Sequence, residues 1–399
     1  MNIGKPKLIR KINRKIILDA IREEGCFSQP YISRKVGMSK QTVSKIITDL
    51  INENLVIETG VGESTSEGGK KPLLLKFNSK GRYVIGIILT HNITAVLTDL
   101  SANVISEKTI PVNLKMGYKE VFITLTKLIK DLISGIEFKN NKILGIGIGI
   151  PGITSDKKIK LLPRFLDWKN YPLVDDLSKK LGIKVFMEND NRLRAYGEKW
   201  FGLAKNINNF VTIFIEEGFG AGLFSEGNII TGSNYLSGEI GHIKFKENGL
   251  PCGCGNKGCL ETLVNLNGVK NLFKEKSKTQ EIKNSPFLDK FKNLENLITF
   301  EILFDYFHRG DKLALFIVNE IIYWLSAGIS IIASTMDPDL IIIHGPYILG
   351  GEYLINRLKD LLKNNYLPNT KKEINLEFSK LGEKAGLYGA VGMVMDNSL

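Results

Sequence analysis

Three of the four cysteines in this chain lie close together in the sequence. Cys252, Cys254 and Cys259 fall within eight positions, and His242 stands ten residues before the first of them. Thiolate sulfur and imidazole nitrogen are ligands that Zn²⁺ prefers, and four of them complete a tetrahedral structural site. The glycines between the cysteines allow a short backbone to wrap tightly around an ion. We therefore expect His242, Cys252, Cys254 and Cys259 to hold a structural zinc ion.

A disulfide bond and unused thiols are the alternatives to this metal site. A bond between Cys252 and Cys254 would close a very strained ring, and three cysteines cannot all pair. A chain with few cysteines, most of them clustered, is typical of a protein in the reducing cytoplasm. The longest uncharged apolar stretch, Ile321 to Met336, has 16 residues, and a spanning helix needs about 20. We expect a buried helix there, no signal peptide and no membrane association.

Positive charge is concentrated at the start of the chain. The net charge is +12, and residues 1–80 hold 15 Lys and Arg against 8 Asp and Glu. Residues 81–399 are four times as long and hold 39 against 34. A concentrated basic segment favours a polyanion as partner, and ordinary solvated surface charge is the alternative.

The pattern of residues 1–80 predicts a winged helix-turn-helix. Isoleucines and an alanine recur at helical spacing in the first helix, where we expect them to bury one face: Ile9, Ile12, Ile16, Ile17, Ala20 and Ile21. Ser28 is expected to cap a second helix with Pro30 in its first turn, and Gly37 supplies the following turn. Ser39 is expected to cap a third helix that runs from Lys40 to about Glu53.

The third helix carries the residue types that read DNA. Its start presents polar and basic side chains suited to phosphate contacts and to base edges in the major groove: Ser39, Lys40, Gln41, Thr42, Ser44 and Lys45. Two strands follow, at 55–57 and 73–77, and the loop between them ends in Gly69, Lys70 and Lys71. A basic, glycine-rich wing tip can approach a phosphate backbone closely. We expect DNA binding, and a plain three-helix interaction module is the alternative.

Strands and helices alternate after residue 81, which predicts α/β layers. Three strand patterns, a helix and a buried strand occupy 83–150, and a weaker version of this order recurs after residue 205. Two related halves with a ligand cleft between them are therefore expected.

Several short segments of this larger part carry a family resemblance. They are Gly149-Ile150-Pro151-Gly152, Glu188-Asn189-Asp190, Gly218 to Gly222, Gly238 to His242, and Cys252 to Glu261. They resemble the ROK family of repressors, open reading frames and sugar kinases, over about residues 80–399. The resemblance implies a duplicated actin-like or hexokinase-like (ribonuclease H-like) two-lobed ATPase-type fold. With its winged head, the whole chain is similar to the repressor branch of this family, which includes xylose repressors.

A sugar site is the next implication of this resemblance. The residues that would line it are Asn189, Asp190, Glu239, His242 and Glu261, with the backbone of Gly152 nearby. Carboxylate and amide oxygens accept hydroxyl hydrogens in fixed directions. His242 would bind zinc through one ring nitrogen and offer the other to a sugar hydroxyl. Arg164 departs from the family's pattern, because many relatives carry a sugar-contacting asparagine there, and this could change the ligand.

The segments that would bind ATP also depart from the pattern of the kinase members. In those members the aspartate matching Asp190 is the general base. The first phosphate loop has an Asp-x-Gly-Gly-Thr core, and here the run is 88–92, Ile-Leu-Thr-His-Asn. The second begins Gly-Thr-Gly, and here it is Glu216-Glu217-Gly218, whose carboxylates would repel phosphate. The turn at 344–346 is also a weaker version. We expect no sugar kinase activity.

These expectations combine into a sugar-responsive repressor of sugar-utilisation genes. Residues 1–80 would bind a palindromic operator, and residues 81–399 would bind a monosaccharide such as xylose or glucose, or a short β-glucoside. The two lobes would be about 81–190 with the C-terminal helix, and about 191–380. A homodimer or higher homo-oligomer would place two heads on the operator. A sugar kinase that uses ATP and a regulator controlled by a protein partner are the alternatives.

Overall fold

The computed structural model describes residues 6–62, 71–90, 92–112, 116–134, 142–155, 159–161, 170–278, 282, 284–365 and 374–399. Four residues singled out from the sequence lie outside these described residues: Gly69, Lys70, His91 and Arg164.

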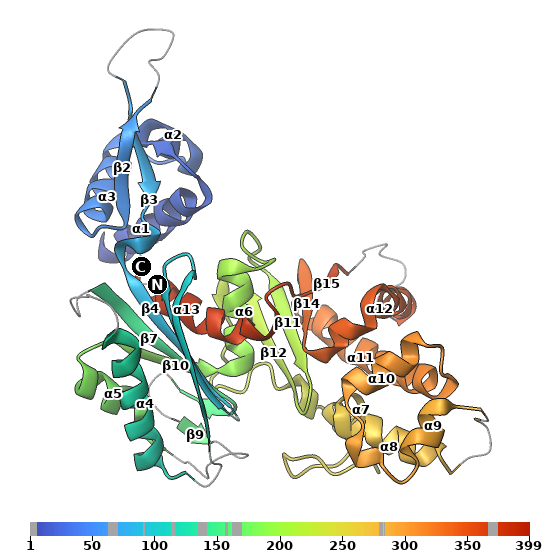
Figure 1. Cartoon of the computed structure of the whole chain (residues 1–399). Helices are drawn as coiled ribbons and strands as arrows, with labels where there is room; N and C mark the ends of the chain where they lie inside the picture. Colours follow the sequence, from blue (N-terminus) through green and yellow to red (C-terminus); the bar gives the residue numbers. More distant parts are fainter. Residues whose placement is uncertain are drawn as a thin grey trace.

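A three-helix module with a small antiparallel sheet opens the chain. Its elements are α1 (Pro6–Glu23), β1 (Phe27–Ser28), α2 (Gln29–Val36), α3 (Lys40–Asn52), β2 (Val56–Val61) and β3 (Leu73–Phe77). The strands lie in the order β1-β3-β2. The β2–β3 hairpin extends away from the rest of the molecule at the top of Figure 1. The expected winged helix-turn-helix is confirmed.

Local signals set the turn between α2 and α3. Gly37 ends α2 with a left-handed φ of 65°, a conformation that glycine adopts without strain. The Ser39 hydroxyl accepts the backbone N–H of Thr42 and so caps α3, as expected. The expected cap at Ser28 is wrong in part. Ser28 occupies the N-cap position with extended backbone, but its side chain makes no capping hydrogen bond, and Pro30 in the first turn starts α2.

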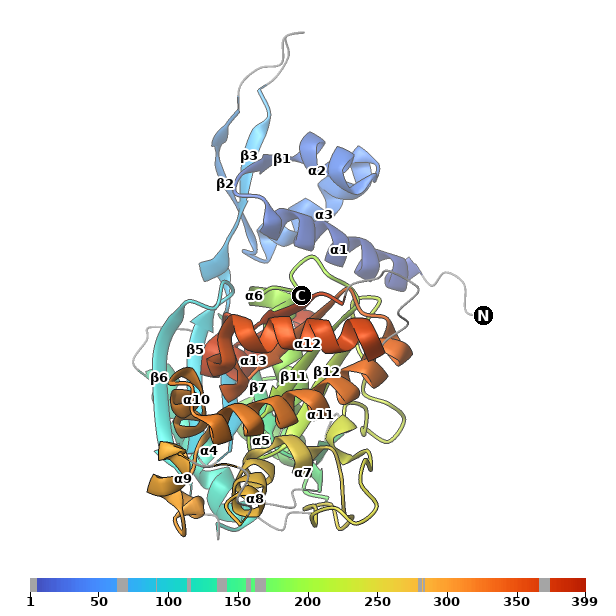
Figure 2. The ribbon, with the colours of Figure 1, turned by 90° about the vertical axis from the view of Figure 1, so that its right-hand side faces the viewer.

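The first helix is only partly buried, which corrects one expectation. Ile17, Ala20 and Ile21 are buried, whereas the side chains of Ile9, Ile12 and Ile16 are 51%, 50% and 42% exposed. The N-terminal half of α1 extends beyond the module, so only its C-terminal half packs on α2 and α3 (Figure 2). The helical spacing identified the apolar face of α1, but it did not show how much of that face other elements bury.

The first half of the larger part is built on a five-stranded sheet. Its strands are β4 (Tyr83–Leu89), β5 (Asn92–Asp99), β6 (Val104–Pro111), β7 (Ile143–Ile150) and β10 (Val185–Asn189), in the order β10-β7-β4-β5-β6. Helices α4 (Tyr118–Ser134) and α5 (Leu173–Leu181) cover one face, and α13 (Ala385–Ser398) covers the other. A small hairpin pairs β8 (Ile153–Thr154) with β9 (Ile159–Leu161).

A second five-stranded sheet repeats this layout. Its strands are β11 (Phe210–Ile215), β12 (Phe219–Ser225), β13 (Asn228–Ile229), β14 (Leu340–His344) and β15 (Leu376–Phe378), in the order β13-β12-β11-β14-β15. In both sheets three antiparallel strands are followed by two parallel ones. The expected duplication is therefore present in the strand order.

Helices cover the second sheet on the side away from the first. The helical stretch expected at about 260–336 consists of α7 (Glu261–Val264), α8 (Leu266–Lys276), α9 (Pro286–Phe291), α10 (Phe300–His308) and α11 (Lys312–Met336), and α12 (Gly351–Asn365) follows. Short 3-10 turns complete the described chain: Ser79–Gly81, Ile240–His242, Glu295–Leu297, Pro346–Gly350 and Gly382–Lys384. Within the described part of the chain, α11 is the one helix long and apolar enough to cross a membrane. Half of its most apolar window is buried inside this fold, as expected for a core helix.

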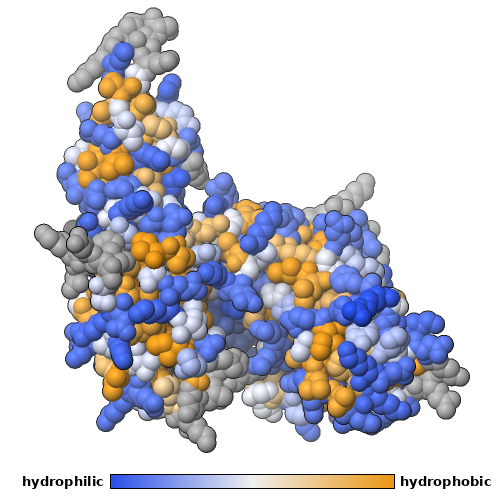
Figure 3. Space-filling model, viewed as in Figure 1, coloured by the Kyte–Doolittle hydropathy of each residue, from blue (hydrophilic) through white to orange (hydrophobic). Residues whose placement is uncertain are grey.

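Two helices, α6 (Asp190–Phe201) and α13, pack side by side between the sheets (Figure 1). Glycines let their backbones touch. A Cβ atom on Gly389 would lie 1.7 Å from the backbone oxygen of Leu193, and one on Gly197 would lie 2.5 Å from that of Ala385. Figure 3 shows the molecule hollowed between the two sheet-bearing halves, with hydrophilic residues in the hollow on that face. The N-terminus of α6 carries two of the candidate site residues, Asn189 and Asp190.

Candidate functional site

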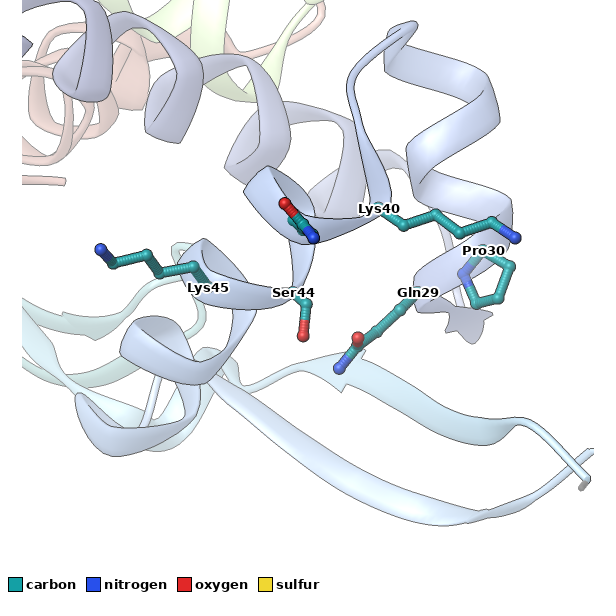
Figure 4. A pocket seen from close by; sticks show the side chains of 6 residues that line it. Gln29, Pro30, Lys40, Ser44 and Lys45 are labelled. Carbon is teal, nitrogen blue, oxygen red and sulfur yellow. The ribbon is translucent and has the colours of Figure 1, made fainter.

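The start of α3 forms a shallow surface hollow together with the start of α2. Six residues line this hollow of 530 Å³: Gln29, Pro30, Lys40, Gln41, Ser44 and Lys45. Figure 4 shows Lys40 and Lys45 extending in opposite directions, with Ser44 between them. Four of the six lining residues were expected from the sequence as DNA-reading side chains, and the fold brings them together.

The other expected DNA-reading residues have different positions. The hydroxyls of Ser39 and Thr42 lie 2.9 Å apart and bond each other, so they order the first turn of α3. Lys71 is exposed just before β3. Gln29 escaped the sequence reasoning although it stands next to the expected cap of α2. Its position in the hollow depends on how α2 and α3 cross, which the local sequence does not show.

The cysteine cluster is assembled as the spacing predicts. Ligand atoms of His242, Cys252, Cys254 and Cys259 all lie within 4.8 Å of one another. Sγ of Cys252 is 3.4 Å from Nδ1 of His242, and Sγ of Cys254 is 3.7 Å from that of Cys259. The backbone reverses at Gly258, whose φ is 72° and where a Cβ atom would lie 1.7 Å from the oxygen of Lys246. Only glycine fits at this close approach.

The chemistry of these four groups fits a bound cation. Burial raises the pKa of the Cys252 thiol to about 12, and burial also raises the pKa of Cys259. A buried thiol therefore pays a large penalty to ionise alone, and a divalent cation offsets it by binding the thiolates. Three sulfurs and one imidazole nitrogen form the donor set of a structural zinc site.

His242 connects this cluster to a carboxylate of the cleft. Its Nδ1 faces Cys252, and its Nε2 lies 3.6 Å from Oε2 of Glu239. Glu261 approaches the cluster from another side. Its Oε2 accepts the backbone N–H of Phe219 at 2.9 Å, and its Oε1 lies 3.5 Å from Sγ of Cys252. The cluster can thus fix both carboxylates relative to β12.

The N-terminus of α6 supplies an amide and a carboxylate. Asn189 caps the helix through Oδ1, which accepts the backbone N–H groups of Asn191 and Arg192. Its Nδ2 donates to the backbone oxygen of Gly152 at 3.1 Å, so Gly152 and Asn189 lie together as expected. Asp190 follows, largely buried.

The carboxylates of the cleft influence one another. Burial is the main cause that raises the pKa of Asp190. Burial also raises the pKa of Glu239, and the charges of Asp190 and Glu261 add to this rise while His242 opposes it. Acidic groups that share a partly dry cleft can accept hydrogen bonds from the hydroxyls of a polar ligand.

A buried arginine that the sequence analysis missed joins α6 to the loop before Glu239. Arg192 is 1% exposed and lies 2.7 Å from Oε1 of Glu188. The same guanidinium donates to the backbone oxygens of Tyr235 and Ser237, both at 3.3 Å. The four-residue spacing of Glu188 and Arg192 was a signal of an ion pair. The contact with the distant loop was not visible in the sequence.

The segments expected from the sequence to differ from kinase phosphate loops lie at the ends of β4, β11 and β14. Glu216 donates its backbone N–H to the oxygen of Gly218 at 3.0 Å, which closes a tight turn between β11 and β12. Ile88 lies near the end of β4. His344, at the end of β14, is buried, and burial lowers its pKa to about 3. Its Nε2 lies 3.4 Å from Oε1 of the buried Glu198.

Comparisons with known proteins agree with this architecture. The sequence profile of the ROK family matches residues 85–397, and a profile described as winged helix-turn-helix DNA-binding matches residues 10–57. The xylose repressor of Bacillus spizizenii is 30% identical over 403 residues, which cover 100% of this chain and 99% of that protein. The glucokinase of Thermotoga maritima is 30% identical over 253 residues, or 63% of this chain and 79% of that protein.

A solved structure extends the likeness to three dimensions. The crystal structure of a ROK family transcriptional regulator, a homolog of the E. coli MLC protein, matches with a TM-score of 0.83 at 25% identity. The match covers 97% of this chain and 96% of that one, so it includes the winged head as well as the two sheet-bearing halves. The chain therefore belongs to the ROK family and carries a winged helix-turn-helix at its N-terminal end.

Proposed function

We propose that this protein is a sugar-responsive, DNA-binding transcriptional repressor of sugar-utilisation genes. One observation carries the proposal. A winged helix-turn-helix and a ROK family body occur on one chain, and a xylose repressor aligns with the whole of that chain. Xylose is the first sugar to test, followed by glucose and short β-glucosides.

The DNA contact is proposed to involve nine residues of the head. They are Ser39, Lys40, Gln41, Thr42, Ser44, Lys45, Gly69, Lys70 and Lys71. The hollow on α3 supports this role for the side chains around Ser44, because polar and basic residues line it at the start of the helix. Lysines would bind phosphates, while Gln41 and Ser44 would reach base edges.

The sugar is proposed to bind Asn189, Asp190, Glu239, His242 and Glu261 beside the backbone of Gly152. The Asn189–Gly152 hydrogen bond and the His242–Glu239 approach support this set, because each orders polar groups within one half, and Arg192 of α6 ties the loop before Glu239 to the N-terminus of α6. Cleft closure on a sugar would favour one arrangement of the body and thereby change operator affinity.

Zinc is proposed as the resident structural ion of the cysteine cluster. It would be held by His242, Cys252, Cys254 and Cys259 and would supply a fixed positive centre behind the sugar-binding carboxylates. Cys26, the fourth cysteine, lies in the head and would take no part.

Loss of catalysis is part of this proposal. Glu216 and Glu217 stand at the β11–β12 turn, and their charge would disfavour a nucleotide phosphate there. A sugar kinase remains the second candidate, because a glucokinase aligns with 63% of the chain and Asp190 is retained. ATP-dependent turnover of glucose or xylose by the purified protein would favour the kinase.

The larger organisation is proposed as follows. Residues 1–80 form the DNA-binding domain, and residues 81–399 form the sugar-binding body in the cytoplasm. Two or more copies would assemble so that two heads contact a palindromic operator.

Isothermal titration with xylose, glucose, cellobiose and N-acetylglucosamine tests the proposal. One sugar should bind the wild type, and binding should be lost in Glu239→Ala and Asp190→Ala. Glu247→Ala is a matched control on the same loop, because its side chain is 82% exposed. The sugar should then change affinity for a duplex selected from a random pool, measured by fluorescence anisotropy. Unchanged duplex affinity at saturating sugar would contradict sugar control and favour a protein partner.

A further inference from the structure

Arg194 lies one helical turn after Asp190 on α6 and turns back toward it. Its side chain is 17% exposed, and its NH1 lies 3.5 Å from Oδ2 of Asp190. The same nitrogen donates to the backbone oxygen of Asp190 at 3.2 Å. An arginine in this position approaches both the side chain and the backbone of a residue proposed to bind sugar.

The guanidinium of Arg194 is held in place by groups from other elements. It lies over the ring of Phe214 on β11, with 3.7 Å between the guanidinium carbon and the ring centroid. Stacking on an aromatic face orients the planar group. On α13, a Cβ atom at Gly386 would lie 3.7 Å from NH1 of Arg194 and 3.3 Å from Cδ1 of Ile88. The guanidinium therefore lies where α6, α13, β4 and β11 meet.

Asp190 has several charged neighbours, and Arg194 opposes the effect of burial most strongly. Burial favours the neutral form of Asp190, while Arg194 and, more weakly, Arg192 favour the charged form. On the facing loop, the charge of Asp190 adds to the rise in the pKa of Glu239. Glu216, in the turn between β11 and β12, attracts Arg194, and the charge of Arg194 adds to the lowering of the pKa of His344 on β14. An ionised carboxylate only accepts hydrogen bonds, whereas a protonated one also donates.

We propose that Arg194 is a positioning residue of the sugar site. Its stacked guanidinium keeps Asp190 ionised and oriented, so that Asp190 acts as a fixed acceptor for a sugar hydroxyl. The site then depends on a residue that need not touch the sugar. The ligand class, a neutral sugar, rests on the proposed function, whereas the action of Arg194 on Asp190 does not.

The first test measures Asp190 directly and needs no sugar. Carbon NMR of ¹³C-carboxyl-labelled aspartate, with Asp190→Asn for assignment, follows the titration of Asp190 in the wild type and in Arg194→Met. Loss of a cation at this distance should raise the pKa of Asp190 by about one unit or more. Arg194→Lys should restore most of the difference. An unchanged pKa of Asp190 in Arg194→Met would overturn the inference.

A control and a second pair of variants protect this test. Arg309→Met removes an exposed arginine that also pairs with an aspartate four residues away, Asp305, and it should leave Asp190 unchanged. Thermal melting shows whether each variant folds. If Arg194→Met does not fold, Arg194→Lys and Arg194→Gln give the same comparison, since one keeps the charge and the other removes it.

The second test reads sugar affinity against pH. In Arg194→Met, affinity for the sugar that binds the wild type should fall in acid, by up to about tenfold at pH values well below the pKa of Asp190, and recover as pH rises, because one pKa unit changes the ionised fraction about tenfold only there. Equal affinity at every pH in wild type and Arg194→Met would also overturn the inference. Absence of any sugar binding by the wild type, together with the expected NMR shift, would reject the proposed function and leave the role of Arg194 standing.

Discussion

Arg14, in the first helix, donates from Nε to the backbone oxygen of Leu399, the last residue of the chain, at 3.0 Å. The other two nitrogens of its guanidinium bind the two carboxylate oxygens of Glu53, at 2.9 and 2.7 Å. Glu53 is the C-cap residue of α3. A single side chain thus links the helix proposed to read DNA with the C-terminal end of α13.

Two more contacts attach the head to the body, one to α13 and one to α6. Nζ of Lys15 lies 2.8 Å from Oδ1 of Asp396 on α13. The guanidinium carbon of Arg22 lies 4.0 Å from the centroid of the Trp200 ring on α6. The opposite end of α6 begins with Asn189 and Asp190. If α6 and α13 move when sugar binds, these contacts would therefore transmit the movement to the position of the head.

Replacing Arg14 by alanine is expected to weaken the effect of sugar on operator affinity. The variant loses its contacts with both Glu53 and Leu399, so the head is held less firmly to the body. Sugar affinity itself should stay within about twofold of wild type, because the removed contacts lie far from the cleft. Anisotropy titrations of duplex DNA with and without sugar measure this. Arg10→Ala, which removes only the exposed pair with Asp49, is the control, and an equal loss of sugar response in both variants would contradict the prediction.

Alanine at Lys40 or Lys45 is expected to weaken DNA binding for all duplex sequences alike. Each lysine is proposed to neutralise one phosphate, so its loss should reduce the salt dependence of affinity by about one counterion. Gln41→Ala should instead relax base preference at one position. Lys312→Ala, at the exposed start of α11, serves as the charge-matched control. Salt titrations of affinity with two or three duplexes distinguish these cases, and an unchanged slope in both lysine variants would argue against phosphate contacts.

Serine at Cys259 is expected to remove the bound metal and to destabilise the fold. Cys259 is fully buried, and metal binding to a structural site contributes to folding free energy, here by several kcal/mol, of which about 2–5 should be visible in the variant. Metal content by mass spectrometry and urea denaturation measure the two effects. Cys26→Ser should keep metal and stability. Wild-type protein that contains no metal would refute the prediction.

Alanine at Gly238 is expected to destabilise the loop that carries Glu239. Gly238 has a φ of 92°, and a Cβ atom there would lie 2.1 Å from the backbone oxygen of Ala221. Strain and collision together should cost about 2–4 kcal/mol and weaken sugar binding. Gly310→Ala is a matched control, since Gly310 has a φ of 77° but nothing within 4 Å of its Cβ position. Urea denaturation should show the smaller cost of about 1 kcal/mol for the control, from backbone strain alone. Equal costs would contradict the predicted collision.

Stability is expected to fall in mild acid because of His344. Burial lowers the pKa of His344 in the folded protein to about 3, below its unfolded value of 6.5. As pH falls through 6.5, the unfolded state takes up the proton first, so this stability is complete above that pH and is lost below it. The loss should reach about 2 kcal/mol near pH 5.

The variant His344→Gln isolates this effect. It should lose less stability than wild type between about pH 7.5 and pH 5, as measured by urea denaturation at each pH. The contribution of Glu198 to stability depends on pH in the opposite direction. Burial raises its pKa above 4.5, so its contribution is present at low pH and is lost as pH rises through the raised pKa. Parallel pH curves for wild type and His344→Gln would contradict the assignment.

Local chemistry explains why much of the head and the cysteine cluster could be predicted from the sequence. Gly37 and Ser39 act within a few residues of their own positions, and so do the ligands Cys252, Cys254 and Cys259. The alternation of strands and helices after residue 81 depends on short-range patterns, and it indicated the duplicated α/β layout. The exposed isoleucines of α1 show the limit of such patterns. Periodicity identifies the apolar face of a helix, but it does not show whether another element packs on that face.

The sequence by itself determined which residues can cap, turn, pair in strands and bind a metal, because those properties act over short stretches of chain. Tertiary structure alone decided which distant groups meet. The role proposed for Arg194 depends on Phe214 of β11, over which its guanidinium lies, and on the close approach of α13 at Gly386. Arg14 meets Leu399 across 385 residues. Burial and charge act through space, so the distant partners of a buried arginine depend on how sheets and helices pack, whereas its partner four residues away follows from helical spacing.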